Sequence, residues 1–322
     1  MRSSSPLFKA IAVAVALCAF WLVFRGKTAK PTDLSTGTTL AVGEWAAPGP
    51  NDVRSPCPGL NSLCEIEVFC EYECATDATT IANHGYLARD GRNIRAIDII
   101  TAMDEYLGIK ADFGFLQTLG AGFRGAFVFL PDFSVGLESY DALTNSHNQI
   151  EHDASFTRND VFFDLVARGV DPKSIKNDAI PHMHNPAVNL TLIDFLVGFS
   201  KDGQTLTVDD IADARHGRLR STVALNPTAN LQSKQTGGMW REAGFVSLIL
   251  GNADGAVRVD WLREWFVNER LPTALGWQKH NAGLIDVIKY TNTYLQAEKV
   301  RNGNNVPGGT PELPIEFGSV LS

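Results

Sequence analysis

The chain has 322 residues, of which 44% are hydrophobic and 20% are charged, and this composition excludes disordered and collagen-like proteins. It has 28 Lys and Arg against 36 Asp and Glu, so the formal net charge is −8 at pH 7. No run of Lys and Arg is long enough to follow a phosphate backbone, and we expect no nucleic-acid partner. The apolar content is enough for one large globular domain or two small ones.

Residues 1–30 are predicted to be a signal peptide or a signal anchor. An unbroken apolar run at 10–24 follows Arg2 and Lys9, and three more basic residues come soon after it. A helix of that length would span roughly 22 Å, less than the ~30 Å hydrocarbon core, which favours a cleaved signal and a secreted protein. The basic residues after the run suit an anchor instead, so a membrane tether through 10–24 is the alternative.

The rest of the chain is expected to be an all-α, mainly helical single domain. Residues 31–51 are rich in Thr, Gly, Pro and Ala and are interpreted as a linker. Thr207 and Asp210 form a capping box, and apolar residues recur at helical spacing in three segments. These three stripes are Ile97, Ile100, Met103 and Leu107; Trp261, Leu262, Trp265 and Phe266; and Leu284, Ile285, Ile288, Thr291 and Leu295. The predicted domain is 52–300, and 301–322 form a C-terminal tail.

One segment, CEIEVFCEYEC at 64–74, breaks this helical pattern. It alternates with period two and holds three of the five cysteines, Cys64, Cys70 and Cys74. Four Glu residues here and the nearby Asp77 carry −5 of the total charge of −8. The cysteine spacing does not match that of zinc sites, which favours an unpaired or disulfide-capable surface loop over a zinc site.

Cys57 lies between two prolines in the sequence SPCPGLN. Pro58 is suited to the first position of a helix, and the free N–H groups of that helix would point back at the sulfur. Such a position lowers the pKa of a thiol and stabilises a metal-bound thiolate. A buried structural cysteine in a Pro-rich turn is the alternative interpretation of this residue alone.

Four motifs in the same order resemble those of the fungal haem-thiolate peroxidases, the chloroperoxidase and unspecific peroxygenase family. They are SPCPGLNSL at 55–63 with ANHGYL at 82–87 and RDGRNI at 89–94, EHDAS at 151–155, ERLP at 269–272, and LGW at 275–277. The resemblance covers about 52–279 and implies a chloroperoxidase-like helical fold that binds haem b. It implies that Cys57 is the proximal ligand of the haem iron.

A thiolate behind a haem iron favours cleavage of a peroxide O–O bond on the opposite face. That cleavage also requires a distal group that moves a proton between the two peroxide oxygens. Glu242 is the candidate, because Phe245, Val246 and Ile249 follow it at helical spacing and place its carboxyl on an apolar face. A buried carboxyl is either protonated through a raised pKa or paired, and a structural ion pair with Arg241 or a distant arginine is the alternative role.

The EHDAS motif is expected to serve two purposes. Glu151 and Ser155 are four residues apart, so on a helical turn their oxygens would face the same way, as a hard cation such as Mg²⁺ requires. By the resemblance, Glu151 and Ser155 give side-chain oxygens and His152 a backbone carbonyl to Mg²⁺ at a haem propionate. The His152 imidazole would orient Glu242 in the catalytic step.

The other aromatic and imidazole side chains are given structural roles. His182 and His184 lie in a turn-rich segment without a third metal ligand and are expected in a solvated loop. His84 is expected to pack a turn between two helices. Four phenylalanines are expected in the core or in a pocket wall: Phe123, Phe127, Phe129 and Phe133.

The predicted function is a haem-thiolate peroxidase that uses hydrogen peroxide to oxidise, oxygenate or halogenate small organic substrates. These three outcomes diverge by pocket shape and solvent access, which the sequence does not specify. The alternative is a degenerate, non-enzymatic member that acts as a secreted or membrane-tethered helical binding module. A purified protein that contains haem supports the first function, and a colourless one supports the second.

The segment 64–81 separates two motif blocks that are adjacent in the family. It has 18 residues, an in-frame length, and its strand-like pattern conflicts with the helices around it. It is either a genuine extra loop or a translated intron, and we expect the mature transcript to lack these codons. Sequencing the transcript tests this, and a dominant message that retains them would contradict the intron hypothesis.

Overall fold

The structure is a computed structural model that does not describe every part of the chain. It describes residues 43–46, 80–89, 91–123, 128–132, 134–139, 153–167, 169–175, 188–229 and 233–303. Cys57, Glu151 and His152 lie outside these ranges, as do the apolar run at 10–24 and most of the segment 64–81. His182, His184, Phe127 and Phe133 also lie outside them.

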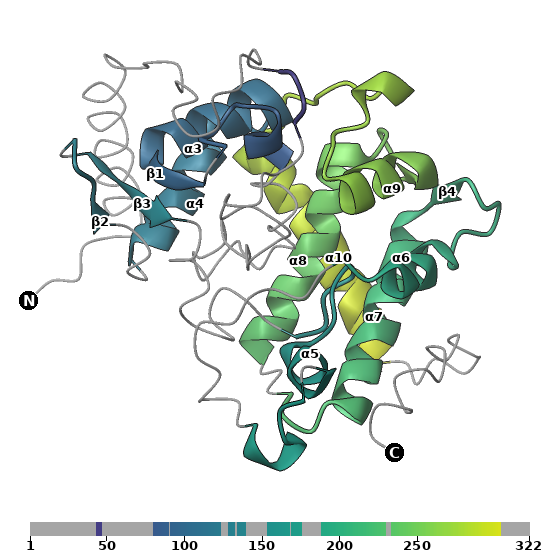
Figure 1. The fold of residues 1–322 in the computed structure, drawn as a ribbon. Coiled ribbons are helices and arrows are strands. Elements are labelled where there is room, and N and C mark those ends of the chain that lie inside the picture. The colour runs from purple at the N-terminus through teal and green to yellow at the C-terminus, as the bar shows by residue number, and fades with distance from the viewer. Residues whose placement is uncertain are drawn as a thin grey trace, which may run out of the picture. The chain divides into compact units, whose positions relative to one another are not determined.

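The first part of the described chain combines a small sheet with two helices (Figure 1). Its elements are β1 (Arg92–Arg95), α3 (Ala96–Ala102), the π-helical turn η1 (Met103–Leu107), α4 (Ala111–Phe123), β2 (Val128–Phe129) and β3 (Val135–Ser139). The sheet is antiparallel with strand order β1-β3-β2, and Ile94 pairs with Leu137. A Cβ atom at Gly136 would lie 2.1 Å from the Ile94 carbonyl oxygen, so only glycine allows this pairing.

The second part is mainly helical. Its elements are α5 (Val161–Ala167), the 3₁₀ turn η3 (Pro172–Ser174), α6 (Leu190–Val197), β4 (Thr205–Leu206), α7 (Val208–Leu225), α8 (Ser233–Leu250), β5 (Val257–Arg258), α9 (Val259–Asn268), the 3₁₀ turn η5 (Thr273–Leu275) and α10 (Leu284–Gly303). β4 and β5 form a two-stranded antiparallel sheet. The mainly helical prediction is therefore confirmed.

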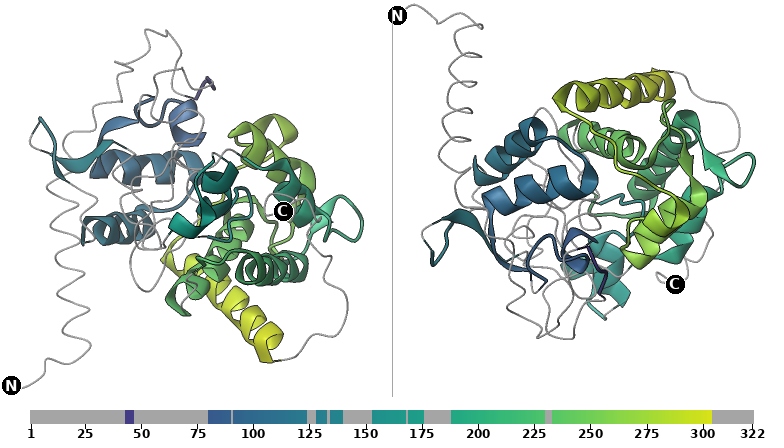
Figure 2. Two further views of the ribbon diagram at one scale, coloured as in Figure 1. Left: turned by 60° about the horizontal axis from the view of Figure 1, so that its bottom comes forward. Right: turned by 90° about the horizontal axis from the view of Figure 1, so that it is seen from above.

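Helices α7, α8 and α10 pack against one another and carry much of the core (Figures 1 and 2). A Cβ atom at Gly244 would lie 3.3 Å from the backbone of Tyr290, so the small residue lets α8 and α10 approach closely. One turn further along α8, Ser247 shares a buried 2.7 Å hydrogen bond with the Tyr294 hydroxyl of α10. This contact fixes the register of the two helices, and α8 carries Glu242.

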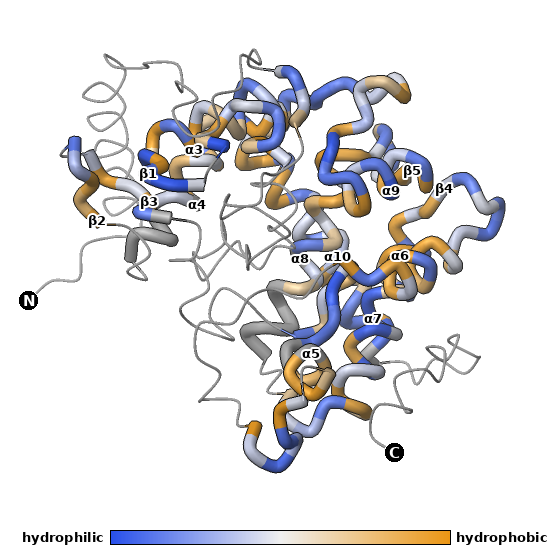
Figure 3. Tube along the Cα trace, in the orientation of Figure 1, coloured by the Kyte–Doolittle hydropathy of each residue, from blue (hydrophilic) through white to orange (hydrophobic). Residues whose placement is uncertain are grey.

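Two of the three predicted apolar stripes are confirmed. Ile100, Met103 and Leu107 are buried along α3 and η1, and Leu262, Trp265 and Phe266 are buried on α9. Figure 3 shows hydrophobic and hydrophilic segments alternating along the described chain. Helix α6 is largely hydrophobic, and the loop before β4 is hydrophilic.

The third stripe, on α10, is confirmed only in part, because Thr291 is buried and Leu284 and Leu295 pack against the core, but the two isoleucines do not. Ile285 is 81% exposed and Ile288 is also exposed, whereas Val287, Thr291 and Tyr294 form the buried face. The reason is that α8 offers a small residue and a hydroxyl at this contact, so α10 turns a mixed apolar and polar face inward. Hydropathy alone misplaced these two isoleucines. Phe129, expected in the core or a pocket wall, is likewise 82% exposed in β2.

Part of the predicted linker at 31–51 belongs to the domain. Gly43 N and Ala46 N donate to the carbonyl oxygens of His84 and Asn83, each at 2.8 Å, and the Trp45 indole donates to the Glu269 carbonyl. The linker interpretation is therefore wrong for 43–46. At the other end, α10 continues to Gly303, beyond the expected boundary at residue 300.

The end of the segment 64–81 lies in the core. Thr80 and Ile81 are fully buried, and residues 80–83 are helical. A chain without this segment would place Ser62 and Leu63 directly before Ala82, a hydroxyl and an aliphatic residue in the same order. Either form of the chain can therefore fill these two core positions with side chains of the same chemical types.

Among the described helices, none has both the length and the apolar composition that crossing a bilayer requires.

The capping box in front of α7 is confirmed. Thr207 Oγ1 accepts from Asp210 N at 3.2 Å, and Asp210 Oδ2 accepts from Thr207 N at 2.9 Å. These two bonds satisfy backbone donors that a helix start leaves free. They fix the beginning of the helix that contributes two arginines to the site described below.

We expect Thr207→Ala to lower the free energy of unfolding by about 1 kcal/mol, because it removes the acceptor for a free helix N–H group. Thr293→Ala is the control, since this exposed threonine inside α10 bonds only to the preceding turn at Lys289 O. Chemical denaturation of both variants measures the difference. Equal losses in the two variants would contradict a specific contribution of the cap.

Candidate active site

Glu242 lies in the buried middle of α8. Its side chain is 1% exposed, and Phe245, Val246 and Ile249 on the following turns are buried as well. The predicted apolar surroundings of this carboxyl are therefore confirmed. A carboxylate in such surroundings requires a compensating charge or hydrogen bond.

The compensating charge comes from Arg215 on α7. Arg215 Nη2 lies 3.1 Å from Glu242 Oε2, and the arginine side chain is fully buried. Arg215 Nη1 donates to the Ala154 carbonyl oxygen at 2.7 Å, and the guanidinium lies 3.6 Å from the centre of the Phe156 ring. The distant arginine that the sequence left as an alternative partner is thus Arg215, while the Arg241 side chain lies outside the described part.

The segment that follows Glu151 and His152 is not helical. Ala154 has φ = +69°, a conformation that non-glycine residues rarely adopt, and its N–H donates to Asp160 Oδ1 at 2.9 Å. Ser155 Oγ accepts from the N–H groups of Thr157 and Arg158 at 3.1 and 3.2 Å. The expected helical turn from Glu151 to Ser155 is therefore wrong for its described half, because this hydroxyl caps a tight turn instead.

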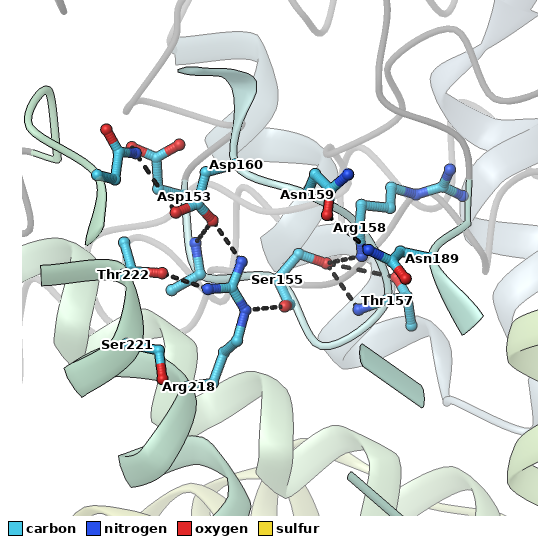
Figure 4. A network of polar contacts seen from close by, with 12 residues as sticks. Asp153, Ser155, Thr157, Arg158, Asn159, Asp160, Asn189, Arg218, Ser221 and Thr222 are labelled. Carbon is cyan, nitrogen blue, oxygen red and sulfur yellow. Dashed lines mark hydrogen bonds and ion pairs between the residues drawn. The ribbon is translucent and has the colours of Figure 1, made fainter. Parts of the chain in front are cut away.

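A second arginine on α7 holds the same segment (Figure 4). Arg218 Nε donates to the Ser155 carbonyl oxygen at 2.8 Å, and its two other nitrogens bond to Asp160 and Thr222. Asn226, just after α7, donates to Asp153 Oδ2 at 3.0 Å and to Asp160 Oδ2 at 3.3 Å. Buried charges and amides thus fix the backbone from Asp153 to Asp160.

These contacts bring two of the predicted motifs together. Glu242 is connected through Arg215 to Ala154, which is two residues after His152. Cys57, Glu151 and His152 themselves lie outside the described residues, so their placement stays a prediction. Among the residues that the structure describes, no group of three His, Cys, Asp or Glu side chains forms a metal site.

The sequence motifs did not indicate Arg215 and Arg218 as site residues. A signal was present, because the two arginines are three residues apart on a helix with a clear capping box and therefore lie on one face. Charged residues on a helix usually face solvent, so the pattern by itself does not indicate two buried cations.

A second polar cluster joins three distant segments at Glu269, the first residue of the ERLP motif. Its carboxylate lies 3.4 Å from Asn83 Nδ2 and 3.6 Å from Arg158 Nη2, and its carbonyl oxygen accepts from the Trp45 indole at 3.4 Å. Glu269 has φ = +48° at the end of α9. The ERLP motif therefore connects the ANHGYL block to the segment after EHDAS.

His84 has the structural role that the sequence indicated. Its Nδ1 lies 3.0 Å from the Gly43 carbonyl oxygen, so this nitrogen carries the hydrogen, and its ring packs 4.9 Å from that of Tyr106. Burial lowers the pKa of His84, and the positive charges of Arg270 and Arg89 lower it further, against the opposing effect of the bond to Gly43.

Comparison with known proteins connects this geometry to a family. The family model "Peroxidase, family 2" matches residues 79–282. A chloroperoxidase of Leptoxyphium fumago is 26% identical over 86% of this chain and 70% of its own length. An aromatic peroxygenase of Cyclocybe aegerita is 26% identical over 71% of this chain and 56% of its own.

Another relative matches a shorter part of this chain at a higher sequence identity. The dothistromin biosynthesis peroxidase dotB of Dothistroma septosporum is 36% identical over 37% of this chain and 27% of its own length. The family match begins after Cys57 and contains Glu151, Arg215 and Glu242. The distal motifs are therefore inside the matched region, and the cysteine turn precedes it.

We expect the folded protein to lose stability as the pH falls below about 6.5, the ordinary pKa of histidine. The folded pKa of His84 is lowered, so below this pH the unfolded chain binds a proton that the folded chain does not. His84→Asn keeps an N–H for Gly43 and does not titrate, so its melting temperature should depend less on pH between about 5 and 7. His280→Asn, the same change at an exposed histidine, is the control. An equal pH dependence of the melting temperature in His84→Asn and in the wild type would contradict the assignment.

Proposed function

The chain belongs to family 2 of the peroxidases and is an oxidoreductase that acts on peroxide, and from this premise we propose the residues that carry out its reaction. In our proposal, Cys57 binds haem b and Glu242 is the distal acid-base group. Hydrogen peroxide then oxidises, oxygenates or halogenates a small organic substrate. The observation that carries the proposal is the fully buried Glu242–Arg215 pair inside the matched region.

The described residues suit the distal side of a haem. An acid-base group there needs apolar surroundings that exclude water and one carboxyl that is fixed in place. Glu242 has such surroundings in Phe245, Val246 and Ile249, and Arg215 fixes its carboxyl. When bound through a cysteinate, haem supplies the oxidising iron, and the thiolate favours cleavage of the O–O bond.

The chain's own contribution is to move one proton. With haem supplying the two electrons for cleavage of the O–O bond, Glu242 would accept a proton from one peroxide oxygen and return it to the other, which would leave as water. The carboxylate must be ionised to accept this proton, and Arg215 supplies the positive charge that an ionised carboxylate needs at a buried position. His152, close in sequence to Ala154, is proposed to orient Glu242.

A magnesium ion at a haem propionate is part of the proposal. Glu151 and Ser155 would give oxygens and His152 a carbonyl, and oxygen ligands of this kind are those that Mg²⁺ prefers. The Ser155 hydroxyl already accepts two backbone hydrogen bonds, so Glu151 is the stronger ligand candidate of the two. The rigid backbone after Asp153 supports a fixed ligand position.

We also propose that the protein enters the secretory pathway through residues 1–30. The charge pattern and the length of the apolar run support a cleaved signal, and the basic residues after it support a tether as the alternative.

The absorption spectrum of the purified protein, reduced and bound to carbon monoxide, tests the proposed function. A thiolate-bound haem gives a main band far to the red of that of a histidine-bound haem. A colourless protein that does not take up haem would contradict the proposal and support the non-enzymatic binding module.

Cys57→Ala is expected to lose haem or to keep it without the thiolate band, because it removes the proposed anionic sulfur ligand. The haem content and the carbon monoxide spectrum measure this. An unchanged spectrum with full peroxidase activity in Cys57→Ala would exclude Cys57 and leave Cys64, Cys70 or Cys74.

Glu242→Gln is expected to lower the rate of the peroxide reaction per bound haem by roughly 10²–10⁴, the usual contribution of a general acid-base group. Haem and its spectrum should persist. Glu264→Gln is a matched control, because it also neutralises a glutamate paired with an arginine, Arg270 at 3.5 Å, but on the partly exposed surface of α9.

Glu151→Gln is expected to have the opposite effect. A neutral amide is a poorer ligand for Mg²⁺, so haem retention should fall while the rate per bound haem is kept. Haem occupancy and single-turnover rates of Glu151→Gln and Glu242→Gln test both roles. The two roles would be exchanged if Glu242→Gln lost haem but kept a normal rate per haem, and if Glu151→Gln kept haem but lost the reaction.

A further inference from the structure

We propose that Arg215 is a positioning residue for the peroxide reaction: its guanidinium holds the Glu242 carboxylate in place and ties it to the backbone that follows Glu151 and His152. This inference rests on the proposed function, because it assigns Arg215 a part in the same proton transfer. Neither the family motifs in the sequence nor the expected roles of Glu151 and His152 require this arginine.

The first observation is the direction of the contacts of Arg215. One terminal nitrogen donates to Glu242 Oε2 at 3.1 Å and the other donates to the Ala154 carbonyl oxygen at 2.7 Å. The guanidinium is planar and rigid, so these two bonds fix the carboxylate relative to the peptide group of Ala154. The Phe156 ring, 3.6 Å from the guanidinium carbon, supports the cation from the same segment.

The second observation is burial. Arg215 is 0% and Glu242 is 1% exposed, so neither charge is stabilised by bulk water. A buried charge that loses its partner is strongly destabilising, whereas replacing both partners by neutral groups is often tolerated. Arg215 therefore gives the Glu242 carboxylate a buried counter-charge and a fixed direction.

The third observation is the contrast with Arg218. This arginine lies one turn later on the same helix, is 4% exposed and holds the Ser155 carbonyl oxygen. Its other partners are Asp160 and Thr222, not Glu242. The two arginines thus share the task of holding the segment, and Arg215 alone of the pair joins it to the acid-base group.

The contacts of Arg215 connect the proposed acid-base group with the segment that holds the proposed Mg²⁺ ligands. Ala154 is three residues after Glu151, and its backbone has the strained φ of +69° that the surrounding hydrogen bonds maintain. A cation that fixes Glu151 would act on the same short segment to which Arg215 anchors Glu242. Arg215 thus joins the acid-base group to the backbone at Ala154, close in sequence to the proposed Mg²⁺ ligands.

The kinetic test compares Arg215→Gln, Arg215→Lys and Arg218→Gln in the haem-containing full chain. We expect Arg215→Gln to lower the single-turnover peroxide rate per haem by roughly 10²-fold, the effect of a misplaced catalytic group. Arg215→Lys keeps the charge and should restore part of this rate. Arg218→Gln should lower stability and haem retention, and should lower the rate per haem much less than Arg215→Gln does, because Arg218 does not contact Glu242.

A double variant separates positioning from general destabilisation. Arg215→Gln combined with Glu242→Gln should react no more slowly per haem than Glu242→Gln alone, because the arginine acts through that carboxylate. Additive losses, or a rate per haem in Arg215→Gln equal to that of the wild type, would overturn the inference.

The second readout does not depend on haem. In thermal unfolding of the purified full chain, the double variant should melt at a higher temperature than Arg215→Gln, since it removes both charges of the pair. Arg218→Gln combined with Glu242→Gln should show additive losses. If Arg215→Gln does not fold, a folded double variant still supports the pairing, and a double variant that also fails to fold overturns it.

The two readouts distinguish the failure of this inference from that of the proposed function. A wild-type protein that binds no haem and does not react with peroxide would refute the proposed function, and the positioning role with it, even if the melting cycle shows the pair. A reactive wild type with an unaffected Arg215→Gln would refute only the positioning role.

Discussion

Two buried guanidinium groups on one face of α7 impose the main constraint on this site. A buried cation must have acceptors on its own helix, on a neighbouring helix or on a nearby loop, because water does not reach it. Arg215 and Arg218 find their acceptors on α8 and in the segment 153–160. The relative placement of α7, α8 and this segment follows from that requirement, and so does the position of Glu242.

The same constraint explains the irregular backbone near the EHDAS motif. Two successive carbonyl oxygens, those of Ala154 and Ser155, accept from Arg215 and Arg218, while Asp160 binds the Ala154 N–H group. A helical turn would direct both carbonyls along its own axis and could not serve two arginines on another helix. The left-handed conformation of Ala154 is therefore a consequence of the buried charges. The segment gains rigidity next to the residues proposed to bind Mg²⁺.

Two other motifs, ANHGYL and ERLP, meet at Glu269. Its carboxylate lies against Asn83 and Arg158, and its backbone carbonyl accepts from Trp45. Residues far apart in the chain thus meet at one carboxylate, and the block that follows the cysteine turn is held to the segment that follows EHDAS.

The sequence by itself determined the family, the mainly helical fold, the cap of α7 and the burial of Glu242. These features depend on local patterns: motif order, helical spacing, and a threonine three residues before an aspartate. Only the tertiary structure decided that Arg215 pairs with Glu242, that Ser155 lies in a tight turn, and that α10 buries Val287 and Tyr294 while two isoleucines stay exposed. The physical reason is that each of these outcomes depends on a partner from a distant segment. The arginine needs a charge, the segment with the turn meets two guanidinium donors, and α10 needs a close-packed helix. No local pattern specifies which partner that is.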